Sequence, residues 1–223
     1  MSKSLLLDID GVIVRDRALL DHVKDNCVSY VRQKLPAAKD PREVNRILYL
    51  AHGHTARGLK NAFQIDTSDF NEKVYDRKLL DHLAEVIYGT EFQQEAKEIH
   101  GLVEQGWDVT LFTNSPSVWA LPVARAIGDD IYVHCPSTNL ENTWLKPEAG
   151  AYKYFPSDQH HILVDDSLKN LGTLRWLSNW SPVYFNAEDP KDHKLWCPTV
   201  SSIWELCLYV NSFKQWSLSQ SDT

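Results

Sequence analysis

A short apolar run that ends in two carboxylates and a glycine limits what this chain can fold into. Residues 5–14 read Leu-Leu-Leu-Asp-Ile-Asp-Gly-Val-Ile-Val, which places the carboxylates at Asp8 and Asp10 and the glycine at Gly11. The run is too short for a helix and has no polar alternation, so it predicts a strand buried on both faces of a parallel sheet. Ligands bind at the carboxyl ends of the strands in such sheets, and we therefore expect a ligand site at these aspartates.

The closeness of Asp8 and Asp10 predicts a bound cation. Side chains two residues apart in a strand lie on the same face. Two carboxylates about 4 Å apart repel each other by roughly 4 kcal/mol at an effective dielectric constant near 20. A protein accepts that repulsion when a cation, a shared proton or a substrate lies between the groups, and we expect a metal. The alternative is that one aspartate caps the next helix and the other is solvated.

The composition narrows the class of protein and of partner. The 223 residues, 43% hydrophobic and 24% charged, can form one large domain or one domain that carries an insertion. A net charge of -7 argues against a nucleic-acid polymer or an anionic membrane as the main partner. The sequence shows no signal peptide or membrane span, and its four cysteines form no CxxC pair. We expect a cytoplasmic protein with free thiols; the sequence leaves its oligomeric state open.

The stretch from about residue 15 to residue 90 has a helical pattern. Apolar positions recur at helical spacing before Pro36, and Asp40 followed by Pro41 predicts the start of a second helix. No strand pattern interrupts this stretch, which is far longer than an ordinary crossover between parallel strands. We therefore predict an α/β core domain made of residues 1–14 and 91–223, and an inserted helical domain, residues 15–90, over the strand ends.

Alternating strand and helix patterns follow the helical stretch. The predicted strands span residues 107–112, 131–133, 161–164 and 182–185, the last of which is expected to end the sheet. Polar residues stand after two of these strands or ahead of a helix: Thr113, Asn114, Lys146, Asp165 and Asp166. Each alone is a common cap or surface residue. Their order along one sheet edge predicts that they form a single site with the two aspartates of the first strand.

In combination these residues resemble the four motifs of the haloacid dehalogenase (HAD) superfamily. That superfamily has Asp-x-Asp after its first strand, Thr or Ser after its second, a Lys before a helix and then an acidic pair. Here the matching residues are Asp8 and Asp10, Thr113, Lys146, and Asp165 with Asp166. The resemblance covers residues 5 to about 171. It implies a Rossmann-like parallel sheet as the core and a helical cap of the C1 type as the insertion.

The resemblance also implies a phosphomonoester hydrolase with Mg²⁺ as its cofactor. Asp8 would be the nucleophile that forms an aspartyl-phosphate. Asp10 would protonate the leaving alcohol and later take a proton from water. Asp8, Asp166 and the main-chain carbonyl of Asp10 would bind Mg²⁺ directly, with Asp165 nearby or acting through water.

The remaining motif residues are expected around the phosphoryl group. Thr113, Asn114, Lys146 and main-chain N–H groups at a helix start would hold its oxygens. Asn170, one helical turn after Asp166, is expected to orient the acidic pair.

The substrate class is predicted from the helical stretch. Residues 53–59 and 69–76 resemble the cap of the pyrimidine 5'-nucleotidase branch, as do residues 111–114 and 164–170 in the core. This implies nucleoside 5'-monophosphates as the small phosphorylated metabolites that bind. Gly11 and Val12 depart from that branch, which usually has Asn-Thr there, and match sugar-phosphate phosphatases and phosphomutases instead.

Several residues of the cap and core could reach such a substrate. Arg57 is the predicted cap contact, because its guanidinium can bind a phosphate or a base carbonyl in a fixed fork; the alternative is a solvated or ion-paired arginine. For His52 and His54 a surface or structural role is favoured. For Trp119 and Trp144 core or interface packing is favoured over stacking on a base.

The same motifs argue for or against other activities. Haloalkanoate dehalogenases lack the second aspartate, so Asp10 argues against a dehalogenase. A non-catalytic phosphate-binding regulator should have lost an essential group, and all four motifs are present. A sugar-phosphate or phosphoglycolate-type phosphatase stays open, and so does a phosphomutase, which would pass the same aspartyl-phosphate to a second hydroxyl.

Overall fold

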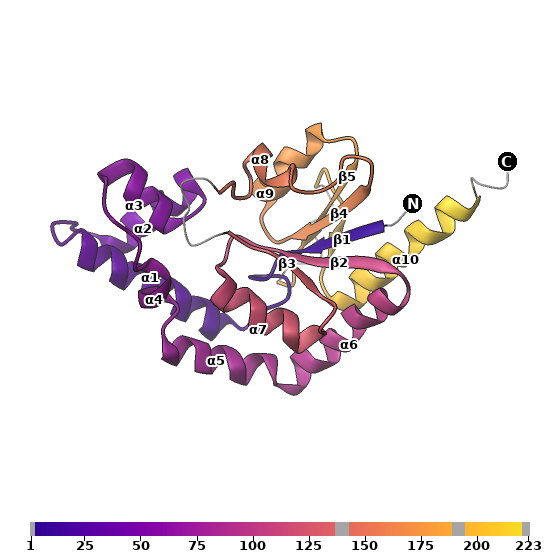
Figure 1. Cartoon of the computed structure of the whole chain (residues 1–223), viewed down its shortest axis with the longest axis horizontal. Coiled ribbons are helices and arrows are strands. Elements are labelled where there is room, and N and C mark those ends of the chain that lie inside the picture. The colour runs from indigo at the N-terminus through magenta and orange to yellow at the C-terminus, as the bar shows by residue number, and fades with distance from the viewer. Residues whose placement is uncertain (1–2, 137–142, 189–194, 220–223) are drawn as a thin grey trace.

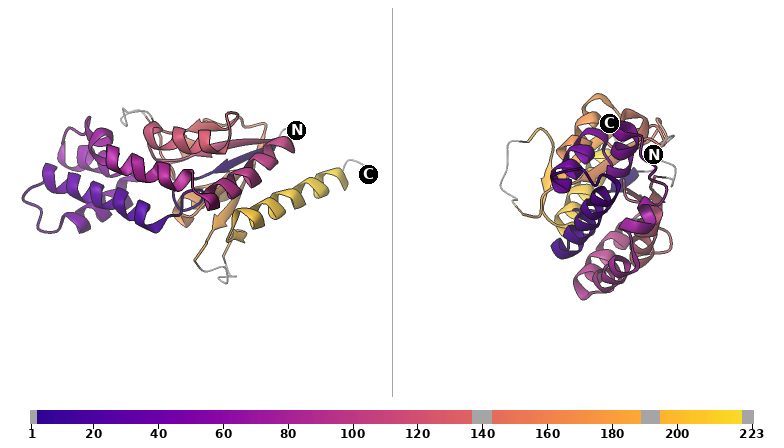
Figure 2. Two further views of the ribbon diagram at one scale, coloured as in Figure 1. Left: turned by 90° about the horizontal axis from the view of Figure 1, so that it is seen from below. Right: turned by 90° about the vertical axis from the view of Figure 1, so that its left-hand side faces the viewer.

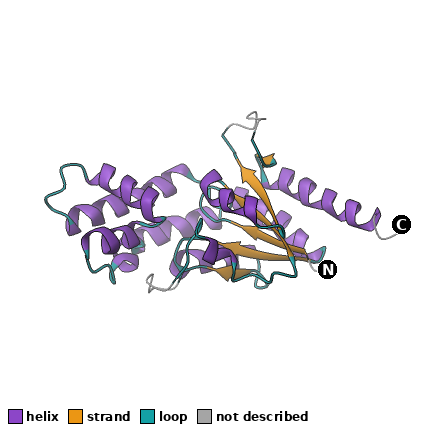
Figure 3. Ribbon diagram, turned by 90° about the horizontal axis from the view of Figure 1, so that it is seen from above, coloured by secondary structure: helices purple, strands orange, loops and turns teal. Residues whose placement is uncertain are grey.

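The centre of the computed structural model, which describes residues 3–136, 143–188 and 195–219, is a parallel β-sheet. Its six strands have the order β3-β2-β1-β4-β5-β6 (Figure 1). The strands are β1 (Lys3–Leu7), β2 (Trp107–Phe112), β3 (Tyr132–His134), β4 (His160–Asp165), β5 (Trp180–Phe185) and β6 (Thr199–Val200). Helices lie on both sides of the sheet (Figure 3), which confirms the predicted α/β Rossmann-like fold class.

The first strand is buried on both faces, as its sequence predicts. Leu5 and Leu7 point into the larger apolar cluster, Leu6 points into the smaller one, and all three are 0% exposed. Because side chains alternate across a strand, one uniformly apolar run contributes to both layers of core.

The helices of the α/β part divide between the two layers. The larger cluster includes residues of α6 (Thr90–Glu104), α7 (Ser117–Ile127) and α10 (Ile203–Ser219). The smaller cluster includes residues of α8 (Ala149–Tyr152), α9 (Leu168–Gly172) and the 3₁₀-helix Thr173–Trp176. In the described part of the chain no helix is both long and apolar enough to cross a bilayer.

One expectation about the sheet is wrong. Residues 182–185 were expected to form its last strand, but β6 pairs beyond them, with Thr199 opposite Tyr184 and Val200 opposite Phe185. A strand of 2 residues is too short to show a hydrophobic period, so only pairing with its neighbour defines it.

A block of helices lies between β1 and α6. It contains α1 (Arg17–Lys34), α2 (Pro41–His52), α3 (Thr55–Phe63), α4 (Phe70–Val74) and α5 (Arg77–Ile87). The start of α2 follows the prediction: the Asp40 side chain accepts hydrogen bonds from the N–H groups of Arg42 and Glu43, with Pro41 as the first helical residue. Figure 2 shows α1–α4 at one end of the molecule and α10 at the other. Helix α5 contacts α7 and leads from this block into α6.

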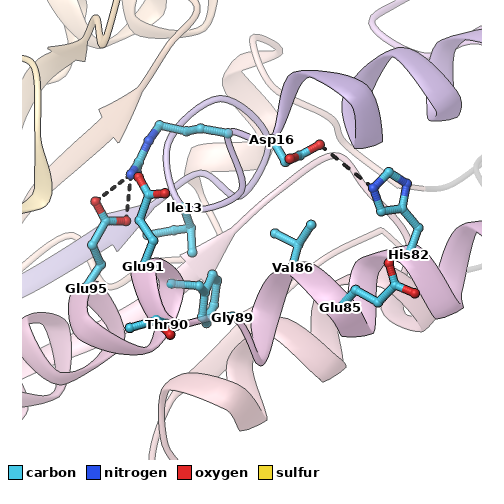
Figure 4. A pocket seen from close by; sticks show the side chains of 11 residues that line it. Ile13, Asp16, His82, Glu85, Val86, Gly89, Thr90, Glu91 and Glu95 are labelled. Atoms are coloured by element: carbon cyan, nitrogen blue, oxygen red, sulfur yellow. Dashed lines mark hydrogen bonds and ion pairs between the residues drawn. The ribbon is translucent and has the colours of Figure 1, made fainter.

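An arginine–glutamate ion pair and a longer histidine–aspartate contact lie at the junction where the chain passes between the sheet and this helical block. Nη2 of Arg15 lies 2.5 Å and 2.6 Å from the two carboxylate oxygens of Glu95, and Nε2 of His82 lies 4.0 Å from Oδ1 of Asp16. Figure 4 shows both contacts around a cavity of about 470 Å³. The first pair joins the end of the β1 turn to α6, so it fixes the exit of the chain from the core.

Candidate active site

The register of the sheet brings separate segments of the sequence to one edge. Leu7 lies opposite Leu111 of β2 and Val164 of β4, so the residues that follow these three strands begin at nearly the same level. The N–H of Asp8 donates to the carbonyl of Val164 at 2.9 Å. This pairing places Asp8 beside Asp165 at the carboxyl edge of the sheet.

A tight turn at Gly11 lets the chain pass close to the acidic pair. The N–H groups of Ile13 and Val14 both donate to the carbonyl of Ile9, at 2.9 Å and 2.8 Å. Gly11 has φ of +83°, which side-chain-bearing residues rarely adopt, and a Cβ there would collide with the carboxylate of Asp166. A glycine is therefore required for the first and last motifs to lie in contact.

Three carboxylates form a cluster that fits a divalent cation. Asp8, Asp165 and Asp166 each offer an oxygen, and these oxygens lie within 4.8 Å of one another. Burial raises the pKa of Asp8 well above its usual value despite the nearby Lys146. Partial burial and the charge of Asp165 raise the pKa of Asp166 to about 7. An all-oxygen set whose negative charges destabilise one another suits a hard cation such as Mg²⁺.

The buried ammonium group of Lys146 offsets part of the negative charge of these carboxylates. Its side chain is 1% exposed, and its Nζ lies 2.6 Å from Oδ2 of Asp165 and 3.1 Å from Oδ2 of Asp8. Burial by itself would lower the pKa of Lys146, but Asp165 and Asp8 outweigh burial and raise it, so the ammonium stays charged. Lys146 therefore lies against the carboxylates that it was predicted to accompany.

The side-chain amide of Asn114 forms hydrogen bonds with both the N–H and the carbonyl of Lys146. Its Oδ1 accepts from the N–H of Lys146 at 2.9 Å, and its Nδ2 donates to the carbonyl of Lys146 at 2.9 Å. Asn114 thus positions the lysine. Asn114 also lies in the lining of the cavity described below, and its amide keeps a second N–H, so its predicted contact with substrate stays a prediction.

The two members of the acidic pair have different surroundings. Asp165 is 0% exposed, and Nδ2 of Asn170 donates to both of its oxygens, at 3.0 Å and 3.1 Å. Asn170 thus orients Asp165, as expected for the pair. Asp166 is the more open of the two, and its carboxylate lies against Gly11. This arrangement makes Asp165 the partner of Lys146 and leaves Asp166 available, with Asp8, to a cation.

Asp10 is held apart from the carboxylate cluster. Its Oδ2 accepts from Oγ of Ser115 at 2.5 Å, and its Oδ1 accepts from Nε1 of Trp119 at 2.9 Å. Thr113 lies on the same loop, where its Oγ1 accepts from the N–H of Ser115 at 3.0 Å. Neither contact to Asp10 was predicted from the sequence. A signal existed for Trp119, since a buried indole N–H needs an acceptor.

A cavity of about 630 Å³ lies above these groups. Its floor contains Asp8, Asp10, Thr113 and Asp166. Its walls come largely from α1, α2, α4 and the residues before α3, and include apolar, aromatic and polar side chains: Leu20, Val23, Asn45, Tyr49, His54, Phe70 and Tyr75. The helical block therefore supplies most of the wall of this cavity.

One of the two cap histidines lies on this wall. His54 is 8% exposed, and its Nδ1 accepts from the N–H of Ala56 at 3.2 Å as the N-cap of α3. Burial lowers the pKa of His54 to about 4, so the ring is neutral at physiological pH. His52 ends α2 and is outside the described lining. His54 therefore caps α3 and also lines the cavity.

The prediction that Arg57 contacts substrate is not supported by its position. Nη1 of Arg57 lies 2.6 Å from Oε2 of Glu148, and the guanidinium also donates to the carbonyl of Thr143. Arg57 lies outside the described lining of the cavity. Its side chain instead ties α3 to the loop that carries Lys146, which is the ion-paired alternative. Trp144, on the same loop, is 54% exposed and lies over Gly150 rather than in the cavity.

The Arg57–Glu148 pair predicts a measurable coupling in stability. Arg57→Met and Glu148→Gln should each lower the free energy of unfolding by about 1 kcal/mol, since one partner is half-exposed and the pair is screened. The double variant should cost little more than either single one. Urea denaturation of the four proteins measures this cycle. Additive losses would show that the pair contributes no coupling, and Arg46→Met, on an exposed pair in α2, is the matched control.

Comparisons with known proteins find similarity in structure alone. No family model and no curated protein match the chain. A HAD phosphatase from Thermococcus onnurineus is similar over 93% of this chain and 97% of its own, with a TM-score of 0.59 and 17% identity. The putative HAD-hydrolase YfnB from Bacillus subtilis, bound to magnesium, has a TM-score of 0.52 and 15% identity over 94% of this chain and 99% of its own.

A phosphomutase has the same architecture. The β-phosphoglucomutase of Clostridium difficile has a TM-score of 0.52 and 13% identity over 98% of this chain and 100% of its own. At such identities the likeness concerns the fold, which hosts different reactions. The similarity extends over more than nine-tenths of this chain and of each of these three neighbours, and the chain therefore has the fold of the HAD-type hydrolases.

Proposed function

We propose that this chain is a metal-dependent phosphomonoester hydrolase that works through an aspartyl-phosphate. The observation that carries the proposal is the separation of two carboxyl groups on one turn. Asp8 lies among Lys146, Asp165 and Asp166. Asp10, two residues further along the chain, instead accepts hydrogen bonds from Ser115 and Trp119. This separation supports a nucleophilic role for Asp8 and a proton-transfer role for Asp10.

The first half of the reaction forms the covalent intermediate. An oxygen of Asp8 attacks phosphorus, the bond from phosphorus to the ester oxygen breaks, and Asp10 gives its proton to that oxygen, so that an alcohol leaves. In the second half water attacks the same phosphorus, Asp10 takes a proton from that water, and the bond from phosphorus to Asp8 breaks. One ester and one water become one alcohol and one phosphate, and both aspartates return to their starting state.

The other residues of the site stabilise the transferring group. Asp8, Asp166 and the main-chain carbonyl of Asp10 would hold a divalent cation, which we propose is Mg²⁺ and which would offset the negative charge of the phosphoryl oxygens. Thr113 and the N–H groups that follow it at the start of α7 would donate to those oxygens. Lys146 keeps Asp8 in place and neutralises Asp165.

Nucleoside 5'-monophosphates are the proposed substrate class. The supporting feature is the cavity wall, where aromatic side chains at Tyr49, Phe70 and Tyr75 stand beside neutral polar ones at Asn45 and His54. A base offers a flat face for stacking and polar edges for hydrogen bonds, which such a wall can bind. We further propose that the protein acts in the cytoplasm on small metabolites, without a nucleic-acid polymer or a membrane as partner.

A screen for released phosphate tests this function. Purified protein with Mg²⁺ is given nucleoside monophosphates, hexose phosphates and phosphoglycolate, with EDTA as the metal-free control. We expect phosphate release that needs the cation and is fastest for a nucleoside monophosphate. A preference for hexose phosphates or phosphoglycolate would contradict the proposed substrate class but would still support a phosphomonoester hydrolase. No release from any ester would overturn the hydrolase.

Phosphoglucomutase-like transfer is the second candidate, favoured by one observation. Gly11 and Val12 match phosphomutases and sugar-phosphate phosphatases better than the nucleotidase branch. A mutase must keep water away from its aspartyl-phosphate. In the same screen a mutase would convert a hexose 1-phosphate to a 6-phosphate with little free phosphate.

A further inference from the structure

Both oxygens of the Asp10 carboxyl group are bound in the folded chain, and both donors come from the segment after β2. Oγ of Ser115 donates to Oδ2 at 2.5 Å, and Nε1 of Trp119 donates to Oδ1 at 2.9 Å. Two hydrogen bonds on different oxygens fix the plane of a carboxyl group as well as its position. The orientation of Asp10 is therefore set by α7 and the loop before it.

The two donors differ in chemistry. An indole N–H can only donate, whereas a hydroxyl can donate or accept. Oδ1 must therefore be an acceptor whether or not the carboxyl group carries a proton. The proton of the acid form therefore belongs on Oδ2, which can accept the Ser115 hydroxyl on a lone pair and still donate its own proton to the leaving oxygen.

Trp119 is itself held firmly. Its side chain is 0% exposed in the larger apolar cluster, and its ring lies 5.6 Å from the ring of Tyr75, centroid to centroid. Tyr75 belongs to the helical block, between α4 and α5, so that block contacts one of the two donors to Asp10. A rotation of the indole would have to displace this packing.

We propose that Trp119 is a positioning residue for Asp10: its indole N–H holds Oδ1, so that Oδ2 is the atom that gives a proton to the leaving oxygen and takes one back from water. This inference rests on the proposed hydrolase. Trp119 acts through Asp10 and not by contact with the substrate, which distinguishes it from an aromatic residue that stacks on a base.

The dependence of rate on the leaving group tests this role. p-Nitrophenolate leaves readily without a proton, whereas phenolate is a poorer leaving group and gains more from an acid. The two esters have nearly the same shape. We expect Trp119→Phe to lower kcat/KM for phenyl phosphate about tenfold and for p-nitrophenyl phosphate about twofold, since one hydrogen bond to the acid is lost. kcat/KM is used because it reports the steps up to the aspartyl-phosphate.

Matched variants separate positioning from packing. Trp180→Phe makes the same change at a buried tryptophan at the start of β5, at the opposite end of the sheet, and should change both esters by less than about twofold. In an Asp10→Asn background Trp119→Phe should have little further effect on phenyl phosphate, because the acid that it positions is gone. Circular dichroism checks that each variant is folded.

The outcomes of these measurements either support or overturn the positioning role of Trp119. An equal loss on both esters from Trp119→Phe, or an undiminished loss in the Asp10→Asn background, would overturn the positioning role while the hydrolase stands. If Trp119→Phe does not fold, Ser115→Ala removes the other donor to Asp10 and must show the same difference between esters; an equal loss would again overturn the inference. If the wild type with Mg²⁺ releases phosphate from neither ester, the proposed function fails and takes this inference with it.

Discussion

Replacing Asp8 by asparagine should reduce phosphate release by about four orders of magnitude or more, because a neutral amide is a far weaker nucleophile than a carboxylate. The fold should survive. Burial raises the pKa of Asp8, so the ionised group is less favourable in the folded chain than in the unfolded one, and its removal relieves repulsion from Asp165 and Asp166. We therefore expect a melting temperature equal to or above that of the wild type.

The matched control for Asp8→Asn is Asp108→Asn, the same change at an exposed residue of β2. It should leave both rate and stability unchanged. Acid quench with a phosphate-labelled ester adds a direct measurement: wild type and Asp108→Asn should trap label on protein, and Asp8→Asn should not. Near-normal turnover or trapped label in Asp8→Asn would remove this residue as the nucleophile.

Replacing Lys146 by methionine should have the largest effect on stability. Methionine keeps much of the volume, but Asp8 and Asp165 lose the ammonium that lies 3.1 Å and 2.6 Å from them. Removing one partner of a buried ion pair typically costs about 3 to 5 kcal/mol, because the other charge stays buried and uncompensated. We expect a loss of that size in the free energy of unfolding, measured by urea denaturation without metal, together with a large loss of activity.

Two further proteins show whether uncompensated charge is the cause. Lys153→Met changes an exposed lysine and should be nearly neutral. Adding Asp165→Asn to Lys146→Met removes one stranded carboxylate and should recover a substantial part of the lost stability, although not the activity. A loss below about 1 kcal/mol in Lys146→Met, or no recovery in the double variant, would contradict the electrostatic account.

Local sequence carries the information for most elements of this fold. The apolar run of β1 predicts a strand with two buried faces, and Leu5, Leu6 and Leu7 are all fully buried. Asp40 with Pro41 predicts the start of α2 because both act within one helical turn. The two-residue strand β6 has no such local signal, since it exists only through pairing with β5.

The residues of the candidate site could also be predicted from local sequence, whereas their side-chain partners could not. Asp8, Thr113 and Asp165 are predicted together because parallel strands in register bring their carboxyl ends to one edge, and the structure places them there. The partners of individual side chains are not predicted. Arg57 is paired with Glu148, 91 residues away, and Trp119 with Asp10, 109 residues away. Contacts at such separations leave no periodic trace in the sequence.

The sequence by itself thus determined the alternation of strands and helices, the helical block after the first strand and the identity of the polar groups at the sheet edge, because these depend on hydrophobic period, caps and turns. Only the tertiary structure decided what each polar group binds. It assigned Asn114 to the main chain of Lys146, Asp165 to Lys146 and Asn170, and Asp10 to Ser115 and Trp119. The physical reason is that a buried donor or acceptor must be satisfied by whatever packing brings within about 3 Å, and packing is a property of the whole chain.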